Sequence, residues 1–284
     1  MCLLMSHLSK IAFQNFQDAV FHLLPCAAGR KILRHLADVN VQHRLTRRNA
    51  RFLCRHDFFQ LVRCQGSFFA GYFQFLCLRE GWGADMLSRT RIFHFGSLSF
   101  THKRCRKATR KAIKAAKSKH RLISFDPNYR PVLWPGEEEA RKWMLYGCSV
   151  CDILKVEASE LAFITQQTTI QNGVDFLQKH YSISLILVTS GEAGSQAFMG
   201  NRKVYQEAFL TNRTIDTTGA GDTFLGCCLA YILEQGMELS DHQLQEMLFR
   251  ANAAASLETT RKGAIRAMPT QAELEDYLKQ LTSF

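Results

Sequence analysis

The chain has 284 residues, of which 46% are apolar and 21% charged, so it can bury a sizeable core and is not disordered in composition. No uninterrupted apolar run reaches the roughly 18 residues of a membrane span, and the first residues make a poor signal peptide. The ten cysteines include one C-x-x-C spacing, at Cys148 and Cys151. This pattern favours the reduced thiols of a cytoplasmic protein over a metal or redox site.

Residues 1–82 differ in composition from the rest of the chain. They carry 11 Lys and Arg against 4 Asp and Glu, which leaves 25 against 21 for residues 83–284. They also hold five of the ten Cys and ten of the 21 Phe, without the periodicity of a helix or a strand. They are either an unusual domain or, as we favour, a segment not selected for a fold, through a shifted reading frame or a mis-called start. The basic charge lies mainly here and follows no nucleic-acid-binding pattern.

From residue 83 onward, apolar runs of strand length alternate with amphipathic stretches. Strands are predicted within residues 91–99, 121–130 and 183–200, the last holding two strands around a glycine turn, and residues 205–216 are predicted to be extended. Residues 151–165 are predicted to be a strand leading into a short helix. Further helices are predicted at residues 103–120, 136–147, 219–236, 241–260 and 270–282. This alternation indicates a layered α/β domain with a mainly parallel sheet. The Lys and Arg of the 103–120 helix could touch phosphates, but a solvated helix face explains them more simply.

Polar clusters follow the predicted strands. They are Gly96–Ser97, Asp126–Asn128, Lys155–Glu160, Thr189–Gly194 and Asp216–Asp222. Because ligands of parallel sheets bind outside the carboxyl ends of the strands, these five clusters predict a single crevice.

The string DTTGAGDTFLG, residues 216–226, carries the strongest chemical signal. Gly219 and Gly221 let the backbone bring the free N–H groups of the following helix close to a ligand. With the helix dipole, they form an anion site suited to phosphate. Asp222 could then take a proton from an attacking hydroxyl, although these residues alone also fit an ordinary acid in the first turn of a helix.

The full string closely resembles the second signature of the PfkB-type, ribokinase-like carbohydrate kinases. The resemblance covers residues 83–284 and continues through FHFGSLS, LISFDPNYRPVLW, CDILKVEASELAFIT, LILVTSGEAGS and ANAAASLETTRKGAIRAMP, which look like fructokinases. It implies a layered α/β/α fold and transfer of the ATP γ-phosphoryl group to a sugar hydroxyl, with Mg²⁺ and a monovalent cation such as K⁺. The implied partners are a sugar and ATP, rather than nucleic acid or a membrane.

The resemblance also assigns roles by position. Asp222 matches the catalytic base, and the amides of Gly219, Ala220 and Gly221 match the anion hole. The residues assigned to the nucleotide and its phosphates are Thr189, Gly191, Gly194, Asn252, Lys155, Asn128 and Arg130. Glu160 matches the support of Mg²⁺-bound water, and Asp216 with Thr218 matches the monovalent-cation site. Without the resemblance, the glycines would indicate only a strand hairpin, Asn252 helix packing, and Arg130 a surface residue after an Asp–Pro turn.

Two features depart from the family pattern. Glu157 stands where the family has Asn or Ser, three residues before Glu160. The family's first strands, its lid and its G-G-x-x-x-N sugar motif should precede residue 83, yet the sequence contains no Gly–Gly pair. We therefore predict that residues 1–82 lack a packed, family-like sheet with a lid, which leaves the family tendency to form homodimers in doubt. Two functions stay open: a fructokinase-like sugar kinase, and a non-catalytic remnant that at most binds nucleotide.

Overall fold

The structure is a computed structural model that describes residues 3–6, 90–264 and 266–282. Within them, one sheet runs in chain order from β1 to β7. Its strands are β1 Leu3–Ser6, β2 Thr90–Gly96, β3 Leu122–Asp126, β4 Ile153–Glu157, β5 Leu185–Thr189, β6 Ser195–Met199 and β7 Arg202–Gln206. Apart from β1, the predictions for residues 1–82, including the lid and the missing sugar motif, fall outside the described residues.

The centre of the sheet is parallel, as predicted. β2 pairs with β3, β3 with β4 and β4 with β5 in parallel, while β1, β6 and β7 add antiparallel pairs at the two sides. The parallel register aligns Gly96 with Asp126 and Glu157 with Thr189, so the carboxyl ends of these strands lie at one edge of the sheet.

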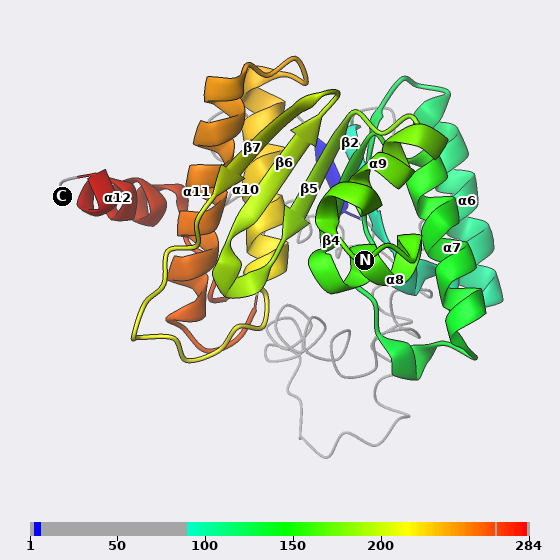
Figure 1. Ribbon diagram of the computed structural model, residues 1–284, viewed down its shortest axis with the longest axis horizontal. Helices are drawn as coiled ribbons and strands as arrows, with labels where there is room; N and C mark the ends of the chain where they lie inside the picture. The colour runs from blue at the N-terminus through cyan, green and yellow to red at the C-terminus, as the bar shows by residue number, and fades with distance from the viewer. Residues whose placement is uncertain (1–2, 7–89, 265, 283–284) are drawn as a thin grey trace, which may run out of the picture.

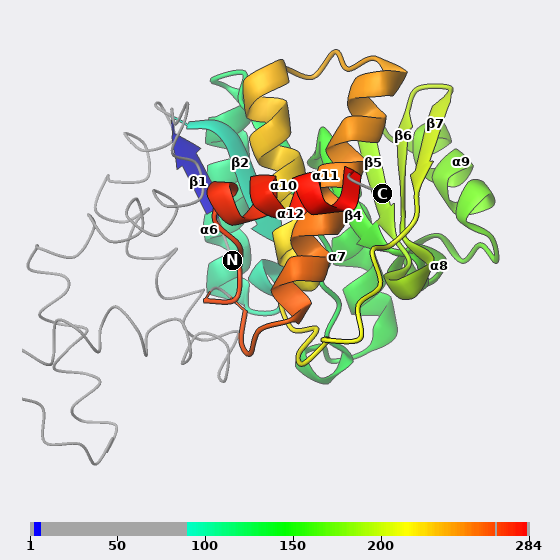
Figure 2. The ribbon, with the colours of Figure 1, turned by 90° about the vertical axis from the view of Figure 1, so that its left-hand side faces the viewer.

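Helices cover both faces of this sheet (Figures 1 and 2). One face is covered by α6 Lys103–Lys117, α7 Glu137–Val150, α8 Ala158–Thr165 and α9 Ile170–His180. The other face is covered by α10 Ala220–Gln235 and α11 Asp241–Thr259, against which α12 Gln271–Thr282 packs. Three short 3₁₀ helices, η1 Ser97–Phe100, η2 Pro131–Leu133 and η3 Gly191–Ala193, lie in the connections. The layered α/β/α architecture is therefore confirmed.

Alternation along the strands divides the core into two halves. In β2, Phe93 and Phe95 pack under α6 and α7, whereas Ile92, the residue before Phe93, packs with α10 and α11. Small side chains on the inner side of α6, such as Ala112 and Ala116, are buried against the first half. Burial of apolar surface on both faces is what fixes the sheet between two helical layers.

Two local elements differ from the sequence expectation. The stretch before residue 183 holds the helix α9, which was not predicted; Thr169 caps it by accepting a hydrogen bond from the N–H of Asn172. Residues 205–216 were predicted to be extended throughout, but β7 ends at Gln206 and a loop follows. Among the described residues, no helix is long and apolar enough to cross a membrane.

The cysteines of the described residues are free and buried. Burial raises the pKa of Cys148 to about 12 and holds the pKa of Cys151 well above its ordinary value. A thiol becomes a nucleophile or a metal ligand only as the thiolate, so these two side chains act as core residues.

Candidate active site

Four of the five predicted polar clusters follow the carboxyl ends of β2 to β5, and the fifth forms the start of α10. The two groups meet at Lys155 of β4, because a Cβ atom added to Gly221 in α10 would lie 3.1 Å from the Lys155 Nζ atom. The first turn of α10 therefore lies beside the strand ends at β4, and the single crevice of the five clusters stays a prediction.

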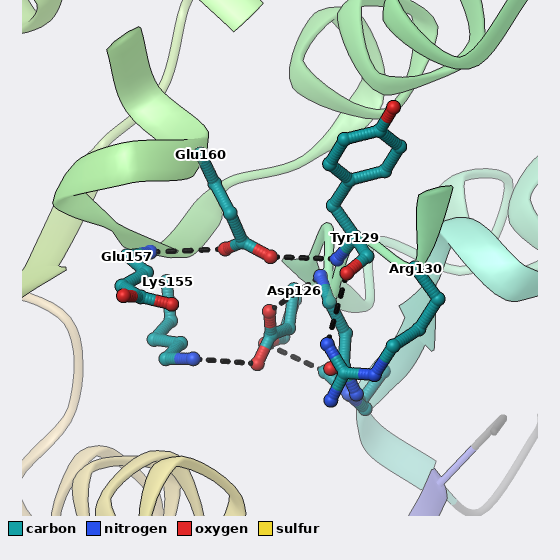
Figure 3. A network of polar contacts seen from close by, with 9 residues as sticks. Asp126, Tyr129, Arg130, Lys155, Glu157 and Glu160 are labelled. Carbon is teal, nitrogen blue, oxygen red and sulfur yellow. Dashed lines mark hydrogen bonds and ion pairs between the residues drawn. The ribbon is translucent and has the colours of Figure 1, made fainter. Parts of the chain in front are cut away.

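A buried ion pair lies in the middle of this site (Figure 3). The Lys155 Nζ atom donates to Asp126 Oδ2 at 3.0 Å, and the two residues are only 8% and 3% exposed. The other carboxylate oxygen of Asp126 accepts a hydrogen bond from the N–H of Asn128 at 3.0 Å. Burial by itself lowers the pKa of Lys155, but the charges of Asp126, Glu160 and Asp222 outweigh it and raise the pKa overall. Lys155 is therefore a fixed positive charge.

Glu160 connects the turn after β3 to the last residue of β4. One of its carboxylate oxygens accepts from the N–H of Tyr129 at 2.6 Å, and the other accepts from the N–H of Glu157 at 3.0 Å (Figure 3). Burial, followed by the charge of Asp126, raises the pKa of Glu160. The Glu157 side chain is exposed, so the extra carboxylate of this chain faces solvent.

Asp222 lies in the first turn of α10, after a glycine N-cap. Gly219 has a φ of 109°, and its carbonyl accepts the first hydrogen bond of the helix, from the N–H of Thr223 at 2.8 Å. The N–H groups of Gly221 and Asp222 precede that bond and so have no acceptor within the helix. Although Asp222 is solvent-exposed, the loss of water around its carboxyl group and the charge of Asp126 raise its pKa, against the lowering effect of Lys155 and Arg130.

Asn128 and Arg130 occupy the turn that follows β3. Asn128 has a positive φ of 44°, a backbone conformation in which Asn is enriched. Arg130 is exposed, and its guanidinium donates to the Tyr129 carbonyl at 2.9 Å. The positive charge of Arg130 lowers the pKa of Asp222, so the guanidinium acts electrostatically on the first turn of α10.

The Asp216 carboxylate connects the loop before α10 with the loop after α11. One carboxylate oxygen accepts from both the N–H and the hydroxyl of Thr218, and the other accepts from the N–H of Gly263 at 3.0 Å. The described residues contain no group of three or more His, Cys, Asp or Glu side chains that could hold a metal ion. A metal at Glu160 or at Asp216 would therefore need most of its ligands from elsewhere.

The residues predicted to lie beside the nucleotide form the connection from β5 to β6. Gly191 and Gly194 have positive φ values of 56° and 83°, and Thr189 pairs with Ser195 across the hairpin. A Cβ atom at Gly194 would lie 2.1 Å from the carbonyl oxygen of Gln206 in β7, so packing alone requires this glycine. Asn252 of α11 donates to the Ser195 hydroxyl at 2.7 Å, which fixes α11 to this connection. Their nucleotide role stays a prediction.

Two residues of the candidate site were given no role in the sequence analysis. Asp126 was expected only as part of a polar cluster, and its ion pair with Lys155 arises because neighbouring parallel strands place the two residues side by side. Glu258, which is fully buried in α11, lies under Gly219, where an added Cβ would be 2.7 Å from the Glu258 Oε1 atom. The sequence offered one indication of Glu258: it is a glutamate that ends the stretch ANAAASLE, which is otherwise rich in small residues.

Solved structures share this fold. The fructokinase of Vibrio cholerae O395, in a form with fructose, ADP and calcium ion bound, matches with a TM-score of 0.61 and 30% identity over 65% of this chain and 59% of its own. An aminoimidazole riboside kinase from Salmonella enterica matches with a TM-score of 0.59 and 25% identity over 66% of this chain and 62% of its own. The fold is therefore the ribokinase-like α/β class.

The chain belongs to the pfkB family of carbohydrate kinases, whose family model matches residues 80–271. Fructokinase-1 of Zea mays is 37% identical over 191 residues, which are 67% of this chain and 59% of that protein. Fructokinase-2 of Solanum lycopersicum is 37% identical over 196 residues, which are 69% of this chain and 60% of that protein. The chain thus spans about three fifths of the length of these curated relatives.

Proposed function

We propose that this protein is an ATP-dependent sugar kinase that transfers the γ-phosphoryl group to a sugar hydroxyl, with fructose as the first acceptor to test. The observation that carries the proposal is Asp222, a carboxylate of raised pKa in the first turn of α10 beside free backbone N–H groups and the Lys155 ammonium. The relatives named as fructokinases support the choice of acceptor. They give no support to the alternative of a non-catalytic remnant.

Each group has a defined part in this reaction. Asp222 accepts the proton of the attacking hydroxyl, and its raised pKa makes it a better base than an ordinary aspartate. The N–H groups at Gly219 to Asp222 and the dipole of α10 stabilise the negative charge of the transferring phosphoryl group. Lys155 and Arg130 add positive charge next to Asp222, which keeps the base ionised although Asp126 lies close by. Thr189, Gly191, Gly194 and Asn252 form the proposed nucleotide side of the site.

The site also fits a magnesium ion carried in with the nucleotide. Asp126, Glu160 and Asp222 face one buried ammonium. Burial is the first cause of the raised pKa values of Glu160 and Asp222, and the negative charge of Asp126, which a divalent cation would offset, is the second. Mg²⁺ typically uses one or two carboxylates plus phosphates and waters, which agrees with the absence of a three-ligand cluster in the described residues. Glu160 and Asp126 would hold it, and it would neutralise charge on the phosphates. Asp216 and Thr218 are the proposed site of a monovalent cation.

The test is the substitution Asp222→Asn, made in the full chain and compared with Asp175→Asn on the exposed surface of α9. Loss of the base should lower kcat by about 10²- to 10⁴-fold. The affinity for Mg·ADP, measured by calorimetry, should stay within a factor of about two, because a base acts on the barrier more than on binding. The Asp175 variant should match the wild type in both measurements.

Two outcomes would contradict the proposal in different ways. Full activity of the Asp222→Asn variant would show that another group takes the proton. A folded wild-type chain that binds Mg·ADP but phosphorylates no sugar would instead establish the nucleotide-binding remnant.

A further inference from the structure

The helix α6 concentrates the positive charge of the kinase region. From Lys103 to Arg121 the chain has ten Lys and Arg and no Asp or Glu, whereas the rest of residues 83–284 has 15 against 21. Without this one segment, the kinase region would carry net negative charge. Nothing in the proposed phosphoryl transfer uses the segment.

Five of these cations form a straight stripe along the exposed side of α6. The stripe consists of Lys103, Lys107, Arg110, Lys114 and Lys117, all exposed, and we call it the α6 stripe. Its members are spaced four, three, four and three residues apart. Since each residue turns the helix by about 100° and raises it by about 1.5 Å, they lie within about 40° of one line and span about 21 Å. The opposite side of the helix packs into the core, and Figure 1 shows α6 at the outer edge of its layer.

The described part of the protein leaves this stripe without neutralising partners. Within the part of the chain that the structure describes, α6 makes one ion pair, between Arg106, which lies beside the stripe, and Glu139 of α7 at 3.2 Å. Arg110 lies over the ring of Tyr146, 5.6 Å from its centroid, and none of the four stripe lysines has an ion pair among the described residues. Like charges three and four residues apart destabilise a helix, so this arrangement opposes the stability of the isolated chain.

We propose that the α6 stripe docks an acidic α-helix of a partner protein. The spacing of four and three residues is that of one helix face, so a partner helix with Asp or Glu at the same spacing, crossing at a shallow angle, places a carboxylate opposite each cation. The exposed large apolar residues among those described, Val132, Tyr205, Leu210 and Ile215, all lie outside α6. The contact is therefore polar and sensitive to salt, and it lacks the apolar residues of a membrane-inserting helix and the aromatic residues that stack on bases.

The experiment uses two synthetic helical peptides of identical composition. One has Glu on a single face at spacings of four, three, four and three residues, and the other distributes the same Glu residues around the helix. Binding to the full chain is measured by fluorescence anisotropy at low and at physiological salt. We expect the patterned peptide to bind about tenfold more tightly at low salt, with the difference shrinking as salt rises.

A matched pair of variants locates the binding. The double charge reversal Lys107→Glu/Lys114→Glu should abolish the preference for the patterned peptide. Lys179→Glu/Lys203→Glu, which changes the net charge equally at exposed positions of α9 and β7, should retain it. Circular dichroism checks that both variants fold. Equal binding of the two peptides would overturn the proposal, and so would tighter binding of a DNA duplex or of phosphatidylserine vesicles than of the patterned peptide.

Discussion

Gly219 offers a direct test of how the first turn of α10 is held. Replacing it with alanine puts a Cβ on a residue whose φ is 109°, a region that side-chain-bearing residues rarely adopt. The same Cβ would lie 2.7 Å from Glu258 Oε1 and 2.9 Å from Cα and Cβ of Ala264. The backbone strain costs about 1–3 kcal/mol. The contacts add to it, because Glu258 is fully buried and part of the clash is with backbone. We expect Gly219→Ala to lower the free energy of unfolding by about 2–4 kcal/mol.

Gly226 supplies the matched control on the same helix. A Cβ added there meets nothing within 4 Å, and its φ is not positive. Gly226→Ala should therefore raise the free energy of unfolding by about 0.5–1 kcal/mol, the ordinary advantage of alanine over glycine inside a helix. Urea titrations of both variants, followed by circular dichroism, measure the two values. If Gly219→Ala is as stable as the wild type, the start of α10 is not held in the conformation described, and the anion site built on it loses its basis.

Two further predictions concern charges. Asp126→Asn should destabilise the fold by about 3 kcal/mol, because it leaves the buried Lys155 ammonium without its paired carboxylate. In urea titrations, the double variant Asp126→Asn/Lys155→Met should recover part of this loss. No recovery would show that the unpaired ammonium is not the cause of the destabilisation. Glu273 has its pKa lowered to about 2, first by its hydrogen bond from Arg261 and then by that from the N–H of Thr270. Its contribution is therefore present above its ordinary pKa of 4.5 and is lost as the pH falls towards 2. Since this side chain is 42% exposed, Glu273→Gln should change stability by less than about 1 kcal/mol. The variant's stability should fall less steeply than that of the wild type between these two pH values, and equal slopes would contradict the assignment.

The features that the sequence predicts well are those with local signals. The start of α10 follows from the glycines and acid at Gly219 to Asp222, and the parallel centre follows from strands alternating with helices. The helix α9 lacks a strong signal, because its buried face is short: Gly173, Val174 and Leu177. The Asp126–Lys155 pair and the contact of Gly219 with Glu258 join residues about 30 to 40 positions apart. Such contacts depend on strand register and helix packing, which no short stretch of sequence encodes.

The order of the strands bears on how the kinase region assembles during synthesis. From β2 to β7, every strand pairs with the one made just before it. Each new strand and its helix therefore find a docking edge already exposed, and no gap between strands has to wait for a later segment. Pairing consecutive strands keeps these contacts closer in sequence than pairing with strands made later would. The face covered by α10 and α11 is the exception, because its helices emerge last. Until then, the apolar side chains of β2, β4 and β5 on that face are open to solvent, and a nascent chain stalled before residue 220 would be the form most prone to aggregate.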